Sequence, residues 1–111
     1  MDYIIVPTSK CLYQEWQLRL LQWSASKVKQ KGKIIFLVSQ DYNHQTEVTN
    51  FDFPDVETLF LPDWAKEWEL TNNNDWWGGI PNKYESIKWL TQNKQFNNSD
   101  RILFLDPDMV F

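Results

Sequence analysis

The chain has 111 residues, a hydrophobic fraction of 42% and a formal net charge of −4. This length and composition suffice for one small core, so we expect a single domain over residues 1–111. The acidic balance argues against a nucleic-acid partner, because such proteins normally present a basic face. No apolar run approaches ~20 residues and no signal peptide is visible, which predicts a cytoplasmic chain without a membrane segment.

Four short apolar runs have the pattern of β-strands, at residues 3–6, 34–38, 58–61 and 102–105. Their hydrophobicity is continuous rather than alternating, which indicates strands buried on both faces. Helical patterns separate the first run from the second and precede the last one. This order predicts an α/β fold with a mainly parallel sheet and flanking helices.

The first helix is expected over residues 10–30, with Ser9 as its cap and Gly32 just beyond its end. Its apolar positions recur at helical spacing, and we expect them to pack on the sheet together with two tryptophans. These residues are Tyr13, Trp16, Leu20, Leu21, Trp23 and Val28.

The second helix is expected over residues 83–94, where Asn82 and Glu85 are spaced like a capping box. Tyr84, Ile87 and Leu90 share one face of it, and Trp89 is expected to pack as well. The segment 63–81 before this helix is a long connection rich in tryptophan and asparagine, and loops of this length are usually functional or mobile.

Polar residues follow three of the predicted strands, at residues 7–9, 39–41 and 106–108. Ligands of open α/β sheets bind beyond the carboxyl ends of the strands, so these segments are candidates for a binding rim. Asp106 and Asp108 come directly after an apolar strand, and carboxylate pairs suit Mg²⁺ or Mn²⁺. An Asp-x-Asp triplet also occurs in ordinary surface turns, and its position after the strand favours the ligand role.

Two further features have a functional and an ordinary explanation. Trp76 and Trp77 lie beside Gly78 and Gly79, and they could stack on a sugar or a base, although tryptophans more often belong to a core. Lys83 could be a plain charge in a first helical turn, but its helix leads to the aspartate pair.

Three segments together resemble the GT-A-fold glycosyltransferases, and among them the group of hydroxyproline O-arabinosyltransferases and peptidyl-serine galactosyltransferases. The segments are residues 13–17 (Tyr-Gln-Glu-Trp-Gln), residues 82–90 from Asn82-Lys83 to Ile-Lys-Trp-Leu, and residues 102–109 (Ile-Leu-Phe-Leu-Asp-Pro-Asp-Met). The last segment is the most specific, because residue type and context both match.

The resemblance implies a Rossmann-like half-domain that binds a nucleoside diphosphate sugar, with UDP as the nucleotide and Mn²⁺ or Mg²⁺ as the cofactor. It implies Asp106 and Asp108 as the metal motif, with Asp108 as the direct ligand and Asp106 on the metal, the ribose or the donor sugar. The residues expected to bind the donor are Pro7, Thr8, Ser9, Asp41, Trp76, Trp77, Asn82, Lys83 and Asp106.

The expected reaction is metal-assisted transfer of the sugar to a hydroxyl acceptor, and no catalytic base can be named in this chain. GT-A catalytic domains are normally more than twice this length, so we expect a truncated, N-terminal part of such an enzyme. Two alternatives remain. One is a non-catalytic sugar- or nucleotide-binding module, and the other is a phosphotransferase of the haloacid dehalogenase type, whose Asp-x-Asp motif belongs near the start of its domain.

Overall fold

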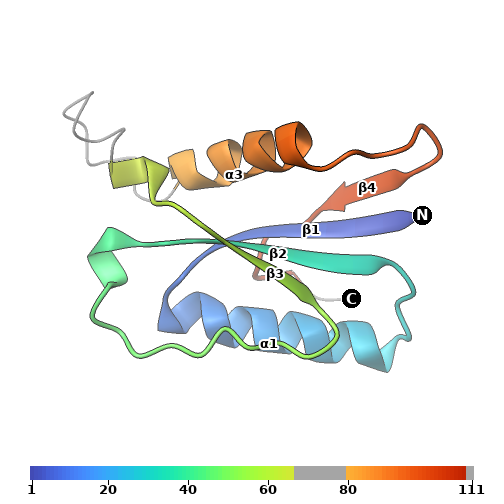
Figure 1. The fold of residues 1–111 in the computed structure, drawn as a ribbon. Coiled ribbons are helices and arrows are strands. Elements are labelled where there is room, and N and C mark those ends of the chain that lie inside the picture. Colours follow the sequence, from blue (N-terminus) through green and yellow to red (C-terminus); the bar gives the residue numbers. More distant parts are fainter. Residues whose placement is uncertain (67–79, 110–111) are drawn as a thin grey trace.

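A parallel sheet with four strands forms the centre of the computed structural model, which describes residues 1–66 and 80–109. The strands are β1 (Asp2–Ser9), β2 (Lys33–Ser39), β3 (Glu57–Leu61) and β4 (Arg101–Phe104). Helices α1 (Leu12–Lys27) and α3 (Ile80–Asn93) cover opposite faces of the sheet, and a short 3₁₀ helix, η1 (Tyr42–His44), follows β2 (Figure 1). The predicted α/β fold with a parallel sheet and flanking helices is therefore confirmed.

The order of the strands across the sheet is β3-β2-β1-β4. Strands β2 and β3 are thus added on one side of β1, and β4 is added on the other side. Ile4 of β1 is flanked by Ile34 of β2 on one side and by Leu103 of β4 on the other. The gap between the carboxyl ends of β1 and β4 is thus a topological switch point. In open α/β sheets a switch point is where ligands bind.

Two apolar layers enclose the central strands β1 and β2, because successive side chains of a strand point to opposite faces. Leu18, Leu21 and Ala25 of α1 pack on one face, and Leu90 of α3 packs on the other. The strand residues on the α1 face are Ile4, Val6, Ile34, Phe36 and Val38, and those on the α3 face are Ile5, Ile35 and Leu37. Burial on both faces accounts for the continuous hydrophobicity of these two strands.

The edge strands are more open than the sequence predicted. Leu103 of β4 is 51% exposed, and Ile102 and Phe104 are also exposed. Among the described strands β4 pairs only with β1, because it lies at the edge of the sheet. The expectation that this strand is buried on both faces is therefore wrong. The strand also ends at Phe104, and the amide of Leu105 still donates a hydrogen bond to the carbonyl of Ile5, at 3.0 Å.

Helix α1 turns a different face to the sheet from the one that the sequence predicted. Trp16 is 63% exposed and Trp23 is 58% exposed, so the prediction that they pack in the core is wrong. Tyr13, Leu20 and Val28 are exposed as well. The helix carries two apolar stripes. The stripe formed by the smaller residues, Leu18, Leu21 and Ala25, is the one that packs on the sheet.

Both ends of α1 also differ from the prediction. Cys11, and not Ser9, precedes the first turn, and its side chain makes no capping hydrogen bond. At the other end the helix stops at Lys27, because Lys29 adopts a left-handed conformation with a φ of 56°. The amide of Gln30 then donates to the carbonyl of Ala25, at 2.9 Å, and closes the helix before Gly32 is reached.

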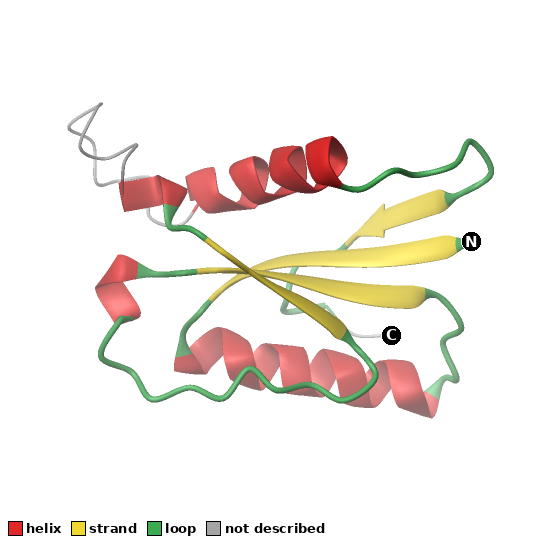
Figure 2. Cartoon of the chain, in the orientation of Figure 1, coloured by secondary structure: helices red, strands yellow, loops and turns green. Residues whose placement is uncertain are grey.

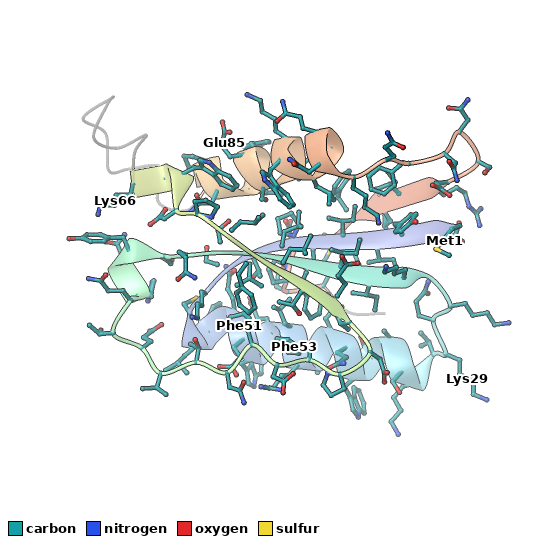
Figure 3. All side chains as sticks on the ribbon, viewed as in Figure 1. Met1, Lys29, Phe51, Phe53, Lys66 and Glu85 are labelled. Atoms are coloured by element: carbon teal, nitrogen blue, oxygen red, sulfur yellow. The ribbon has the colours of Figure 1, made fainter. Side chains whose placement is uncertain are left out.

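The connection from η1 to β3 runs along α1 and completes the core on that side (Figure 2). Its residues Phe51 and Phe53 are buried, and Figure 3 shows both between the ribbon of α1 and the sheet. Glu15 of α1 holds this connection, because its carboxylate accepts hydrogen bonds from the amide of Asn50 (3.1 Å) and from the guanidinium of Arg19 (2.9 Å). Burial of this acid is thus balanced by two donors.

Helix α3 begins at Ile80, two residues before the predicted capping residue. Asn82 therefore lies inside the first turn, and the predicted capping box of Asn82 and Glu85 is wrong. Pro81 occupies the second helical position, where the missing amide hydrogen costs no hydrogen bond. Leu90 is buried and Trp89 packs against the same layer, as predicted, whereas Tyr84 is exposed.

Candidate functional site

A hollow of about 280 Å³ lies at the switch point between the carboxyl ends of β1 and β4. Residues from three parts of the chain line it: the end of β1 with the start of α1, the first turn of α3, and the segment after β4. The lining residues are Pro7, Thr8, Ser9, Gln14, Asn82, Lys83, Asp106 and Pro107. Six of them are among the predicted donor-binding residues, so the structure brings these six together.

The β1 side of the hollow is organised by Gln14 of α1. Its carbonyl oxygen accepts hydrogen bonds from the hydroxyl of Thr8 and from the backbone amide of Ser9, both at 2.5 Å. The side chain thereby ties the first turns of the helix to the end of the strand. Gln14 is not among the predicted donor-binding residues, although it belongs to segment 13–17, which carries the resemblance, and lies early in the helix that follows the strand.

The opposite side of the hollow carries an ion pair. The ammonium of Lys83 lies 2.8 Å from Oδ1 of Asp106, and both side chains are about half exposed. One positive and one negative group thus face the same small space. The Asp106 carboxylate therefore has a lysine partner in this structure.

Asn82 is buried at the wall of the hollow. Its hydrogen bonds tie the first turn of α3 to the segment after β3, and Asp63 of that segment bonds in turn to η1. The side-chain oxygen of Asn82 accepts a hydrogen bond from the amide of Ala65, and its side-chain nitrogen donates to Oδ1 of Asp63, both at 2.9 Å. The other oxygen of Asp63 accepts from the amide of Tyr42, at 2.8 Å. Both polar atoms of Asn82 are therefore used within the fold, and it shapes the wall of the hollow.

Asp41 lies at the same edge of the sheet but is not one of the residues that line the hollow. It precedes η1, and its carboxylate accepts a hydrogen bond from the amide of Asn43, at 3.1 Å. Partial burial raises the pKa of this carboxyl above its ordinary value, although His44 and that amide act in the opposite direction. Its position supports a role in the local turn.

The two candidate metal residues differ in their position relative to the hollow. Asp106 lines the hollow, whereas Asp108 is exposed and lies outside the lining. Within residues 1–66 and 80–109, no group of three or more histidine, cysteine, aspartate or glutamate side chains comes together to hold a metal ion. Two carboxylates are a partial oxygen donor set, which suits Mg²⁺ or Mn²⁺ once phosphate oxygens and water complete it.

Trp76 and Trp77, predicted to stack on a sugar or base, lie outside the described residues. Cys11 is buried, and burial raises the pKa of its thiol above the ordinary value. This cysteine therefore has the character of a small core residue and not that of a nucleophile.

A second hollow, of about 480 Å³, lies at the other end of α1, near the start of β2. It contains none of the predicted site residues. Two of its cations are already paired, Arg19 with Glu15 and Lys33 with Glu57, each at 2.9 Å. Its position at the amino end of the strands is also not one where α/β sheets usually bind ligands.

Comparisons with protein-family models, with curated proteins and with solved structures find no match to this chain. Among the helices that the structure describes, none is both long enough and apolar enough to cross a membrane.

Proposed function

We propose that the hollow between β1 and β4 binds the donor of a glycosyltransferase, a nucleoside diphosphate sugar such as a UDP-sugar. The observation that carries the proposal is the position of the hollow at the switch point, with Lys83 and Asp106 on one side and the end of β1 on the other. A ligand there would lie outside the carboxyl ends of the strands, as in other open α/β sheets.

The charges favour a ligand with phosphate groups at the α3 side. Lys83 supplies a mobile ammonium, and it lies in the first turn of α3, where the helix dipole also favours negative charge. The nucleoside then occupies the β1 side, near Thr8, Ser9 and Gln14. The hollow is at the small end of the ~300–1,000 Å³ range of ligand sites, so the sugar extends beyond it.

Asp106 and Asp108 would hold the metal ion together with the phosphate oxygens. When bound, such an ion neutralises the negative charge that develops on the leaving diphosphate. Within this chain, Lys83 adds a second positive charge on the same phosphates, since a phosphate oxygen can replace Asp106 as its partner. That exchange frees the Asp106 carboxylate for the metal.

The proposal is tested by calorimetric titration of the chain with UDP, with and without Mn²⁺. Asp106→Asn and Lys83→Met should each weaken binding, and the Mn²⁺ dependence should disappear in Asp106→Asn and in Asp108→Asn. The matched controls are Asp52→Asn and Lys88→Met, which change the same charges at exposed positions outside the hollow. Failure of the parent chain to bind UDP under either condition would contradict the proposal.

A non-catalytic nucleotide-binding module would give the same titration result, so transfer is tested separately. Release of UDP from a UDP-sugar, followed over time in the presence of Mn²⁺, reports on cleavage of the sugar–phosphate bond. Cleavage that requires Asp106 supports a glycosyltransferase. Tight binding without any release of UDP supports a binding module, or a donor-binding part that needs further catalytic groups.

A further inference from the structure

We infer that Gln14 selects the ligand of the hollow by hydrogen-bond polarity and favours a base with a carbonyl group over one with an amino group in its place. The inference rests on the proposed function, because it names what the β1 side of that site recognises. Uracil and cytosine differ in this way at C4, where uracil carries a carbonyl oxygen and cytosine an amino group, so we place the C4 group of the base against Gln14.

The orientation of the Gln14 amide is fixed by its neighbours. The backbone amide of Ser9 can only donate, so the Gln14 atom that faces it must be the carbonyl oxygen. The hydroxyl of Thr8 contacts the same oxygen. A flipped side chain would set two donors against each other, and the amide nitrogen therefore has to point away from the end of β1.

That nitrogen is the group which remains for a ligand. Among residues 1–66 and 80–109 it has no hydrogen-bond partner, and Gln14 lines the hollow. An amide nitrogen can only donate, so it favours a ligand atom that accepts. The polar atoms of Asn82 are engaged by Ala65 and Asp63 and cannot add to this selection.

The two hydroxyls on this side behave differently. The hydroxyl of Ser9 can donate or accept, because its hydrogen rotates to suit the partner, whereas the hydroxyl of Thr8 donates its hydrogen to Gln14 and can only accept. Gln14 is thus the described side chain lining the β1 side whose unused group can only donate. Replacing its nitrogen by an oxygen reverses that polarity and leaves both accepted hydrogen bonds in place.

The test compares UDP with CDP on the parent chain and on Gln14→Glu, by calorimetric titration with Mn²⁺ present. The parent should prefer UDP by about tenfold, the upper end of what one hydrogen bond contributes net of the competing bonds to water. In Gln14→Glu the ratio of the two affinities should shift towards CDP by about tenfold or more. The added negative charge affects both nucleotides equally, so the ratio isolates the hydrogen bond.

Gln92→Glu is the matched control, because it makes the same chemical change on an exposed position of α3 outside the hollow, and its ratio should equal that of the parent. Binding of both nucleotides with an unchanged ratio in Gln14→Glu would overturn the inference and leave the proposed function standing. A parent that binds neither nucleotide would overturn the proposed function. Should Gln14→Glu not fold, equal affinities of the parent for UDP and CDP would still overturn the inference.

Discussion

Lys83 and Asp106 form an ion pair of 2.8 Å on one side of the hollow, and the two residues come from different elements, the first turn of α3 and the segment after β4. Both side chains are about half exposed, so the pair contributes only ~0.2–1 kcal/mol to stability. Such a pair separates readily when each side chain can form a stronger interaction. A diphosphate with its metal ion would give Lys83 a phosphate partner and Asp106 a cation.

The first prediction concerns this pair. Lys83→Met should increase the affinity for Mn²⁺ without nucleotide by about two- to fivefold, because the Asp106 carboxylate then loses its competing ammonium. The same variant should bind UDP more weakly, since one positive partner of the phosphates is gone. Titration of Mn²⁺ followed by electron paramagnetic resonance measures the first effect, and calorimetry measures the second.

Lys88→Met is the control for Lys83→Met, because Lys88 is exposed on the same helix and does not line the hollow. Its affinities for Mn²⁺ and for UDP should equal those of the parent. Equal Mn²⁺ affinity in Lys83→Met and Lys88→Met would mean that the ion pair does not compete with the metal.

A second prediction concerns stability at acid pH. The hydrogen bond from the Arg101 side chain lowers the pKa of Asp2, and the backbone amide of Asn97 lowers the pKa of Asp100. An acid with a lowered folded pKa stabilises the fold above its unfolded pKa, about 3.9 for aspartate, and this contribution is lost as the pH falls through the folded value. The urea midpoint should therefore decrease from about pH 5 downwards.

Asp41 acts in the opposite direction. Burial raises its pKa, so its cost to the fold is removed when it is protonated at low pH. The double variant Asp2→Asn, Asp100→Asn should flatten the acid decline, while Asp52→Asn should keep it. Urea denaturation from pH 7 to pH 2.5 provides the comparison, and equal slopes for the parent and the double variant would show that these acids do not control it.

The fold followed from the sequence because its two central strands are continuous apolar runs. A run such as residues 34–38 has to be covered on both faces, and this requirement leads to a parallel sheet between helices. The lateral order of strands is not encoded in any local pattern. The position of β4 at an edge, and the exposure of Leu103 that results, could not be predicted from an apolar segment.

The candidate site was predictable where it depended on strand ends and not where it depended on side-chain geometry. Thr8, Ser9 and Asp106 follow apolar runs, so their shared edge was expected from the topology of such sheets. The role of Gln14 depends on a hydrogen bond to the end of β1, and that bond requires the position of α1 relative to β1. Pro81 did signal the early start of α3, because proline is favoured in a first helical turn.

A third prediction tests which face of α1 is buried. Leu21 is fully buried, so Leu21→Ala should lower the free energy of unfolding by about 2–5 kcal/mol. Trp16 is largely exposed, and Trp16→Gln should change it by less than about 0.5 kcal/mol. Guanidinium denaturation measures both. A larger loss of unfolding free energy in Trp16→Gln than in Leu21→Ala would instead support the helix orientation predicted from the tryptophan positions.

The last prediction concerns Asn82, which holds the loops at the carboxyl edge. Its side chain is 3% exposed and bridges Ala65 and Asp63. In Asn82→Ala the buried amide of Ala65 loses its acceptor, which should lower the free energy of unfolding by about 1–3 kcal/mol. UDP affinity should also fall at temperatures where the variant is folded, because Lys83 is the next residue and its turn loses this anchor.

Asn93→Ala is the control for this effect. Asn93 is exposed at the end of the same helix and donates one hydrogen bond to the carbonyl of Trp89, at 2.8 Å, so its loss should cost less than about 0.5 kcal/mol. Urea denaturation of the two variants, followed by titration with UDP, separates the stability effect from the binding effect. If Asn82→Ala lost no more stability than Asn93→Ala, the bridge from Ala65 to Asp63 would not be what orders this wall. The Lys83–Asp106 ion pair would then have to be positioned by the core packing of α3 alone.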